Sequence, residues 1–171
     1  MTSKESDWQI APLGPDHDRS QFTCGKDDLD RWIRQYARQS EESGILHTYV
    51  AVPKGQTKVV GYFSIRTSEV QCARVPADEV TRLPKYPLPT ILVARLAVDR
   101  SVQGRGLGAD LLMAALSKAL RVSEIAGAYL VDVVATDDDA RSFYKKFEFR
   151  ELIDDPKHLF LRMSKVRKLL A

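Results

Sequence analysis

A cluster of glycines in the stretch SVQGRGLGADLL is the first feature that could do chemistry. Gly104, Gly106 and Gly108 follow an apolar run and precede an amphipathic helical pattern. A helix that opens directly after such a turn presents free N–H groups and the positive end of its dipole. Glycines also let the backbone approach a phosphate without interference from Cβ. The turn is therefore a candidate phosphate site, and a merely flexible turn is the simpler alternative.

Two other residues could take part in chemistry near this turn. Tyr144, in the stretch DDDARSFYKKF, carries a phenol whose ordinary pKa of ~10 makes it a proton source at neutral pH. Core packing beside Phe143 is the alternative for that ring. Arg95 interrupts the apolar stretch TILVARLAVD just before the turn. A buried unpaired cation is costly, so Arg95 is expected to face a partner or solvent.

The elements that position these residues follow from the hydrophobic periodicity. Helices are expected over residues 27–43, 108–125 and 137–147, and Gly44 is expected to end the first of them. Strands are expected over residues 46–53, 58–70, 90–99, 128–135 and 158–165, with a short helix and a loop within 76–89. One apolar face of the first helix is expected to hold Leu29, Trp32, Ile33, Tyr36 and Ala37. The order predicts a mixed α/β sheet with flanking helices in a single domain, residues 1–171.

Composition narrows the class of protein. The chain has 171 residues, 44% of them hydrophobic, and a net charge of only +3. No apolar run approaches the ~20 residues of a membrane span, and the first residues lack the apolar core of a signal peptide. Cys24 and Cys72 have no metal-ligand spacing and are expected to be reduced thiols of a cytoplasmic protein. His17, His47 and His158 are scattered, form no metal motif and are expected on the surface or in loops.

Known phosphate-binding patterns separate the candidates for the glycine turn. The dinucleotide fingerprint requires G-x-G-x-x-G near a first strand, and the P-loop requires G-x-x-x-x-G-K-[ST]. Neither fits. The stretch LAVDRSVQGRGLGADLL instead resembles the Q/R-x-x-G-x-G/A motif of the GNAT N-acetyltransferases, with Gln103, Gly106 and Gly108 in its fixed places. VVATDDDARSFYKKFEF resembles the second motif of that family, which Ala140, Phe143 and Tyr144 match.

This resemblance implies a GNAT fold: a mixed, mostly antiparallel sheet with a splayed central pair of parallel strands. It also implies acetyl-CoA as the acetyl donor and Tyr144 as the general acid that protonates the leaving thiolate. A main-chain N–H near Leu96 to Val98 would polarise the thioester carbonyl. The residues implied to contact acetyl-CoA are Leu96, Ala97, Val98, Gln103, Gly104, Arg105, Gly106, Leu107, Gly108, Asp137, Ala140 and Phe143. Glu148 and Asp137 depart from the family, which usually has glycine and often asparagine there.

A narrower resemblance covers most of the chain. FTCGKDDLDRWIRQYARQS, YPLPTILVARLAVD and FYKKFEF are similar to the GNAT toxins of bacterial toxin–antitoxin modules. That resemblance implies acetylation of the α-amino group of aminoacyl-tRNA, which blocks translation. It also implies a homodimer, a ribbon-helix-helix antitoxin, and contact with DNA only through that antitoxin. Trp32 and Tyr36 are expected to supply apolar area to the dimer. No metal and no membrane are implied.

The basic residues could serve this substrate. Those expected to meet tRNA phosphates are Arg34, Arg38, Arg74, Arg82, Lys85 and Arg95. Lys165, Arg167 and Lys168 form a second basic group, for which a solubilising tail is the alternative. Phosphate contacts of this kind supply affinity that weakens with salt. Two other functions stay open: a GNAT enzyme that acetylates a small amine or a protein amino group, and a degenerate, non-catalytic GNAT module.

Overall fold

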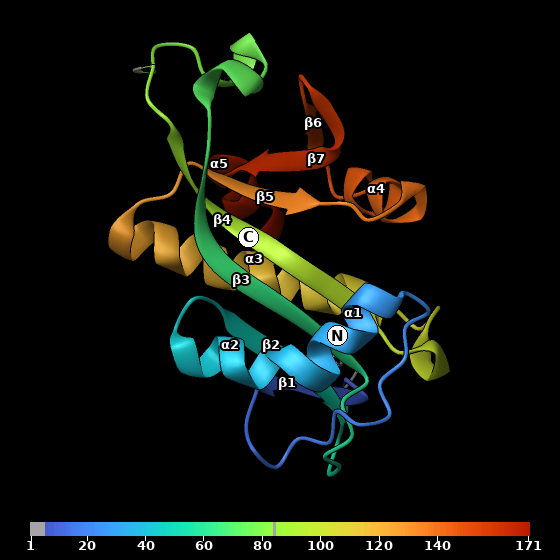
Figure 1. Ribbon diagram of the computed structural model, residues 1–171. Helices are drawn as coiled ribbons and strands as arrows, with labels where there is room; N and C mark the ends of the chain where they lie inside the picture. The colour runs from blue at the N-terminus through green and yellow to red at the C-terminus, as the bar shows by residue number, and fades with distance from the viewer. Residues whose placement is uncertain (1–5, 84) are drawn as a thin grey trace. The chain divides into compact units, whose positions relative to one another are not determined.

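The computed structural model describes residues 6–83 and 85–171. Within them the chain forms a seven-stranded sheet in the order β1-β2-β3-β4-β5-β7-β6 (Figure 1). The strands are β1 (Trp8–Pro12), β2 (His47–Pro53), β3 (Gly61–Val70), β4 (Leu88–Val98), β5 (Leu130–Val134), β6 (Arg150–Leu152) and β7 (Asp155–Arg162). The helices are α1 (Asp27–Arg31), η1 (Trp32–Tyr36), α2 (Ala37–Ser43), α3 (Leu107–Ala126), α4 (Asp138–Lys145) and α5 (Met163–Leu170). Short 3-10 turns are η2 (Cys72–Arg74), η3 (Ala77–Glu79) and η4 (Arg100–Val102).

The sheet is mixed, as predicted. β4 and β5 are parallel, and they pair from Thr90 with Leu130 to Val93 with Val133. The pairs β1–β2, β5–β7 and β6–β7 are antiparallel. The contacts between residues divide the chain into two compact units. The first comprises residues 6–64 and 95–114, and the second comprises residues 65–83, 85–94 and 115–171. Strands β3 and β4 and helix α3 contribute residues to both.

The core of the first unit is built around Tyr62 on β3. Its ring stacks on Trp32, with centroids 5.7 Å apart, and meets the edge of Phe22 at 5.4 Å. Its buried hydroxyl donates to the carbonyl of Leu29 at 2.8 Å. This hydrogen bond satisfies the phenol within a largely apolar cluster and ties the first helix to the sheet.

The first helix departs from ideal α-helical geometry. Residues Trp32–Tyr36 form the π-helix η1, whose wider turn shifts the positions that follow it relative to a 3.6-residue period. Ala37 is buried as predicted, but Tyr36 is 48% exposed, so its placement on the apolar face is wrong. Trp32 is only 7% exposed and offers no surface to a dimer, which corrects that expectation too. Gly44 ends the helix with φ 74°, as predicted.

The second unit joins β5, β6, β7 and the first half of β4 to helices α4 and α5. One face of its strands forms an apolar cluster of Val70, Val75, Leu88, Leu130, Leu152 and Phe160. The buried carboxylate of Glu79 lies among cations of the same unit: Arg150 at 2.8 Å, Arg162 at 3.6 Å and Lys165 at 3.8 Å. These ion pairs hold the segment after β3 against β7 and α5.

Three elements differ from the sequence-based expectation. β1 and β6 were not predicted, because strands of five and three residues are too short for a clear period. The strand expected over residues 158–165 ends at Arg162, and Met163 begins helix α5. Met163 and Val166, which are about one helical turn apart, are buried. Arg167 and Lys168 are exposed, and Lys165 is half-exposed. Lys165, Arg167 and Lys168 are therefore residues of an amphipathic helix rather than of a tail.

Candidate active site

The glycine turn has the geometry that an anion site requires. Gly104 and Gly106 take φ values of 80° and 87°, a region that residues with a Cβ rarely adopt. Nothing lies within 4 Å of where a Cβ would stand at either position. Both glycines lie outside the regular elements, and their N–H groups donate to no other residue that the structure describes. The turn therefore offers backbone donors and open space at the start of α3, which fits a pyrophosphate.

Asp99 anchors the turn at its N-terminal side. Its carboxylate accepts hydrogen bonds from the Thr23 N–H at 2.9 Å, the Ser101 N–H at 3.0 Å and the Ser101 hydroxyl at 2.7 Å. Burial raises the pKa of Asp99, but these hydrogen bonds outweigh burial and hold that pKa below its ordinary value. Asp99 therefore stays ionised and joins the end of β4 to the loop at Thr23.

The side chain of Gln103 has a structural role. Its amide donates to the carbonyl of Val98 at 2.9 Å and to the carbonyl of Cys24 at 3.1 Å. Both amide N–H donors are thus used within the first unit, which leaves the side-chain oxygen and the backbone of Gln103 for contact with a ligand. The cofactor contact expected at Gln103 is therefore limited to those groups. The bridge between the Val98 and Cys24 carbonyls explains why the motif has a glutamine at this position.

Arg105, between the two glycines, is also held from within the first unit. Its guanidinium contacts the Asp7 carboxylate at 3.1 Å and lies 5.3 Å from the centre of the Trp8 ring. The Trp8 indole N–H in turn donates to Asp110 in the first turn of α3, at 2.9 Å. The strand β1, which the sequence pattern missed, therefore braces the glycine turn from outside.

The strand end that was expected to polarise the thioester leaves its parallel neighbour. β5 pairs with β4 only as far as Val93, whereas β4 continues to Val98. Leu96, Ala97 and Val98 therefore have no β5 partner, which agrees with the splayed pair that the family resemblance implies. The side chain of Ala97 packs in the Tyr62 cluster, so only the backbone of this residue is available to a ligand.

The second motif lies on α4, in the second unit. Asp137 caps this helix: its carboxylate accepts the N–H of Ala140 at 2.8 Å. An aspartate caps as well as the asparagine of many family members, so this departure preserves the local structure. The side chain that was expected at the cofactor is thus engaged with the helix. Ala140 and Phe143 are half-buried on the same helix.

Tyr144 is 5% exposed and packs against Phe143, with ring centroids 5.3 Å apart. Burial raises the pKa of its phenol well above the ordinary value. The phenol is therefore fully protonated at neutral pH, as a proton donor must be. Both interpretations of Tyr144, packing and proton donation, agree with this environment, and the catalytic role stays a prediction.

Glu148 stands in the left-handed region, with φ 70°. A glycine would adopt this conformation without strain, which explains why the family usually has one there. Glu148 keeps the glycine conformation and bears its steric cost of roughly 1 kcal/mol.

Three of the six cations expected at tRNA lie in the first unit, and each has a protein partner. Arg34 Nε donates to the carbonyl of Phe22 at 2.9 Å, and Arg38 pairs with Glu42 at 3.1 Å. The Arg95 guanidinium lies 4.2 Å from the centre of the Trp32 ring. The half-buried Arg95 thus meets an aromatic face of the protein, as a partly buried cation is expected to meet a partner.

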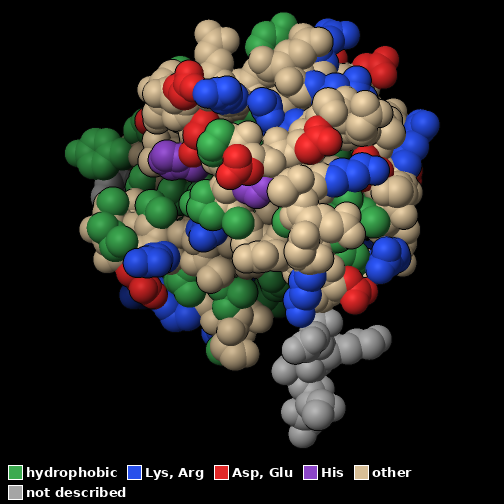
Figure 2. Space-filling view, turned by 90° about the horizontal axis from the view of Figure 1, so that it is seen from below, with side chains coloured by type: hydrophobic (Ala, Val, Ile, Leu, Met, Phe, Trp, Pro, Cys, Tyr) green, Lys and Arg blue, Asp and Glu red, His purple; other side chains and the backbone are tan. Residues whose placement is uncertain are grey.

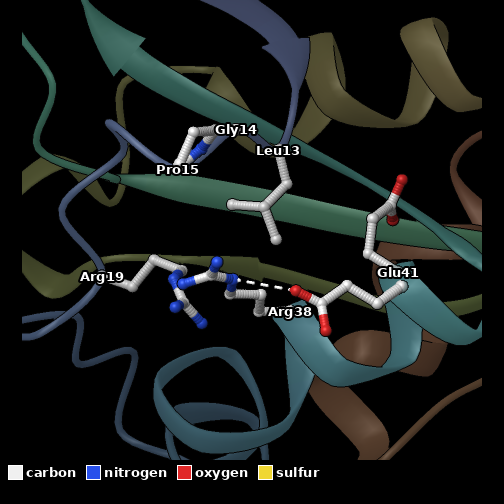
Figure 3. A pocket seen from close by; sticks show the side chains of 7 residues that line it. Leu13, Gly14, Pro15, Arg19, Arg38 and Glu41 are labelled. Atoms are coloured by element: carbon white, nitrogen blue, oxygen red, sulfur yellow. Dashed lines mark hydrogen bonds and ion pairs between the residues drawn. The ribbon is translucent and has the colours of Figure 1, made fainter.

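A pocket of about 230 Å³ in this unit includes Arg38. It is lined by Leu13, Gly14, Pro15, Arg19, Arg38, Glu41 and Glu42, and the side chains of Arg19 and Arg38 point into it (Figure 3). Neither the glycine turn nor α4 contributes to its walls. Arg19 also donates to the carbonyl of Ile33 at 2.8 Å, so it is fixed in place.

The other three expected cations lie in the second unit. Arg74 contacts Asp154 at 3.0 Å and His158 Nδ1 at 3.2 Å. Arg82 and Lys85 are exposed, and no ion pair to either occurs within the described part of the chain. On the face seen in Figure 2, Lys and Arg side chains alternate with Asp and Glu rather than forming a continuous basic stripe. The charge pattern alone therefore does not define an RNA surface on that face.

The sequence analysis missed one polar pair. His158 was expected on the surface or in a loop, but it lies on β7 with its side chain only 15% exposed. Its Nε2 lies 2.7 Å from the buried carboxylate of Asp132 on β5. No spacing signal links these residues, because they meet only through the antiparallel pairing of β5 with β7.

Comparison with known proteins decides the family. The model of the Acetyltransferase (GNAT) family matches residues 11–149, which include both motifs. The chain belongs to the GNAT acetyltransferase family. Membership confirms the predicted fold, and it confirms an N-acetyltransferase that uses acetyl-CoA as the donor of the acetyl group.

Relatives within the family are similar over nearly their whole length. The tRNA-acetylating toxin of Mycobacterium tuberculosis is 35% identical over 154 residues, which are 90% of this chain and 91% of the relative. The structure of AtaT complexed with acetyl-methionyl-tRNAfMet matches with a TM-score of 0.89 and 26% identity, covering 96% of this chain and 100% of that one. A mutant of the AtaT toxin, bound to the C-terminus of the antitoxin AtaR and acetyl-CoA, matches with a TM-score of 0.83 and 25% identity, over 97% and 99% of the chains.

The helices that the structure describes were compared with the requirements of a membrane span. Within residues 6–83 and 85–171, none combines the length and the apolar character that crossing a bilayer demands.

Proposed function

We propose that this GNAT enzyme is a toxin that transfers acetyl from acetyl-CoA to the α-amino group of aminoacyl-tRNA and so blocks translation. The observation that carries the proposal is the 35% identity, over 90% of the chain, to a tRNA-acetylating toxin. The similarity to AtaT with an acetylated aminoacyl-tRNA supports the same substrate class. We further propose that residues 1–171 act as a single catalytic domain.

The proposed chemistry divides among this chain's own groups. Acetyl-CoA supplies a thioester carbonyl and a thiolate leaving group. The N–H groups from Gln103 to Gly108 hold the pyrophosphate, helped by the dipole of α3. A main-chain N–H between Leu96 and Val98 stabilises the developing oxyanion. Tyr144 donates a proton to the thiolate. Ala140 and Phe143 of α4 contact acetyl-CoA, and Asp137 caps that helix beside it.

The choice of amine also fits aminoacyl-tRNA. An α-amino group has a pKa of ~8, against ~10.4 for a lysine side chain, so it loses its proton more readily. The charged residue in the middle of β4 is Arg95 rather than a carboxylate base. A cation there favours an anionic substrate such as the tRNA acceptor end.

Affinity for tRNA is assigned to Arg34, Arg38, Arg74, Arg82, Lys85 and Arg95. Arg82 and Lys85 are exposed without ion pairs to the described residues, so they can meet phosphates at no cost in protein contacts. Arg38 must give up an exposed pair with Glu42, which costs about 0.5 kcal/mol or less. Arg34 and Arg95 are held by the protein, at the Phe22 carbonyl and on the Trp32 ring, so they contribute to tRNA affinity less than the exposed cations do.

We also propose the partners that go with a toxin. A ribbon-helix-helix antitoxin would block the substrate site with its C-terminal segment, as the complex of AtaT with the AtaR C-terminus suggests. DNA would be met only through that antitoxin. A homodimer stays part of the proposal, with Tyr36 rather than Trp32 as its apolar contact. Since aminoacyl-tRNA is cytoplasmic, the enzyme would act in the cytoplasm.

The alternative is a GNAT enzyme for a small amine or a protein amino group. The two are separated by incubating the enzyme with labelled acetyl-CoA and either charged tRNA or small primary amines, at increasing salt. The proposal expects label on tRNA and a rate that falls steeply with salt as phosphate contacts are screened. Transfer to a small amine at an equal or higher rate, with no salt dependence for either acceptor, would support the alternative.

A further inference from the structure

A chain of polar contacts in the second unit has no role in the chemistry described so far. His158 Nε2 lies 2.7 Å from Asp132 Oδ2, and Arg74 Nη2 lies 3.2 Å from His158 Nδ1. Arg74 Nε also reaches both oxygens of Asp154, at 3.0 and 3.1 Å. The chain thus runs from a buried aspartate on β5, through a histidine on β7, to an arginine in η2 near the surface.

The contacts determine which imidazole nitrogen carries the proton. A guanidinium can only donate, so the Nδ1 that faces Arg74 must accept. The ring proton of neutral His158 therefore lies on Nε2 and is donated to Asp132. The basic nitrogen of His158 is Nδ1, and the guanidinium of Arg74 covers it.

Asp132 is held in an unusual state for a purely structural residue. It is 1% exposed, and its Oδ1 has no hydrogen-bond partner among the described residues. A buried carboxylate with an unsatisfied oxygen is costly, and such groups are rare unless function retains them. A neutral imidazole offers Asp132 one hydrogen bond, whereas an imidazolium would also compensate its charge. The pair is therefore built to accept a proton at His158 Nδ1.

The pair also lies at a suitable place in its unit. Asp132 immediately precedes Val133, the last residue of β5 that pairs with β4. β5 then leads into α4, which carries Tyr144. Thr90 on β4, paired with Leu130, has a buried hydroxyl that likewise finds no partner within the described chain. Of these two polar groups, Asp132 lies next to the point where the parallel strands part, and Thr90 lies at the opposite end of their pairing.

We propose that His158 is the general base of the reaction, with Asp132 as its positioning residue and Arg74 as a removable cover. This inference rests on the proposed function. The ammonium form of the aminoacyl group gives one proton to His158 Nδ1, which leaves a neutral amine and an imidazolium held by Asp132. The amine lone pair forms the C–N bond to the acetyl carbon, and the C–S bond breaks. The thiolate takes a proton from Tyr144. The nitrogen of the new amide then loses its extra proton, which returns Tyr144 to its neutral form. His158 releases its proton to solvent.

Arg74 is the link between base and substrate. It belongs to the cations assigned to tRNA, and a phosphate at the acceptor end would compete with His158 and Asp154 for its guanidinium. Binding of tRNA would then uncover Nδ1. The charged groups that face His158 are Asp132 from β5, Arg74 from η2 and, through Arg74, Asp154 ahead of β7.

The test is the pH profile of His158→Gln, measured as initial rates of acetyl transfer to aminoacyl-tRNA. At about pH 6 most of the α-amine is protonated, and the variant should lose about 10²-fold relative to wild type. At about pH 8.5 the amine is neutral without help, and the loss should shrink to less than about threefold. His47→Gln is the matched control, because His47 also pairs with a carboxylate, Glu41 at 2.9 Å, but in the first unit. Its profile should follow that of wild type.

A second variant protects the test against misfolding. Asp132→Asn keeps an acceptor for the imidazole N–H and removes the charge, so it should show the same pH-dependent loss in milder form. Parallel profiles for wild type and a folded variant, whether the rates are equal or uniformly lowered, would overturn the role of His158 and leave the proposed function intact. A wild-type protein that acetylates no aminoacyl-tRNA would overturn both.

Discussion

The ring of Phe149 lies against the ring of Tyr144, with centroids 5.6 Å apart, at the point where helix α4 ends. The Phe149 N–H reaches back to the Tyr144 carbonyl at 3.4 Å, and the Glu148 N–H reaches the Lys145 carbonyl at 3.1 Å. With Glu148 in the left-handed conformation, these contacts form a Schellman motif together with its usual hydrophobic contact. The end of the helix therefore fixes the ring of the proposed acid.

The first prediction concerns the phenol itself. Tyr144→Phe keeps both ring contacts and removes only the proton donor. We expect turnover to fall by about 10²–10⁴-fold, the usual contribution of a general acid. Acetyl-CoA affinity, measured by calorimetry, and the melting temperature should change little. A variant with full turnover would show that another group protonates the thiolate.

The second prediction concerns the backbone strain at Glu148. Glu148→Gly should leave stability unchanged or raise it by up to about 1 kcal/mol, because relief of the left-handed strain exceeds the added chain entropy. Glu148→Val should destabilise by about 1–2 kcal/mol and lower turnover, since a β-branched residue resists this conformation. Lys146→Val is the matched control: Lys146 is exposed nearby, but its φ is −62°. Thermal melts and rates that do not separate the two valine variants would contradict this account.

The third prediction follows from the lowered pKa of Asp99. A carboxyl group whose pKa is depressed by folding stabilises the protein above its unfolded pKa of ~3.9, and that stability disappears as pH falls through the folded value. Melting temperature should therefore drop below about pH 4. Asp99→Asn should remove part of this acid dependence and lower stability at neutral pH. Asparagine keeps only one acceptor oxygen, so the N–H of either Thr23 or Ser101 would face an amide NH2 group, and acetyl-CoA affinity should fall as well.

If melting temperature falls with decreasing pH in the same way for Asp99→Asn and wild type, the assignment to Asp99 is contradicted. The loss would then have to come from other carboxyl groups whose pKa values are also lowered. The half-buried Glu151, which contacts Lys145 and Arg141, is one such group.

The fourth prediction separates two roles of Arg95. Its contact with Trp32 should contribute about 1–2 kcal/mol, so Arg95→Gln should lower the melting temperature. If Arg95 also meets a tRNA phosphate, the variant should have a higher KM for aminoacyl-tRNA. The slope of log affinity against log salt concentration should also decrease in magnitude by about 1. Arg66→Gln, which removes an exposed arginine of β3, is the control for charge alone. A lower melting temperature with KM and salt slope unchanged would leave Arg95 with a structural role only.

The sequence predicts much of the fold because its central elements carry strong patterns. The apolar run of β4, the long amphipathic α3 and the left-handed Gly44 all lie where periodicity and turn chemistry place them. Tyr36 is placed wrongly because a π-helix breaks the 3.6-residue period without any signal in the residue types. β6 and β1 are too short to be detected. The boundary at Arg162 was missed because the expected strand ran on to residue 165, where the structure has helix α5.

The candidate site divides in the same way. Motif residues such as Gly106 and Tyr144 can be found from spacing, because the cofactor turn and the proposed acid are local features. The structural work of Gln103 and Asp137 cannot, since it depends on carbonyl and N–H partners that folding supplies. Asp132 and His158 are hidden for a further reason: they are 26 residues apart and meet only across β5 and β7.

The central claim is tested most directly by mass spectrometry of bulk aminoacyl-tRNA incubated with the enzyme and acetyl-CoA. Nuclease digestion releases the terminal adenosine with its amino acid attached. The account predicts aminoacyl-adenosine that has gained one acetyl group on the α-amine with wild type, and a strongly reduced amount with Tyr144→Phe. Unmodified aminoacyl-adenosine, together with acetyl transfer by the same enzyme preparation to a small amine or a protein, would contradict it.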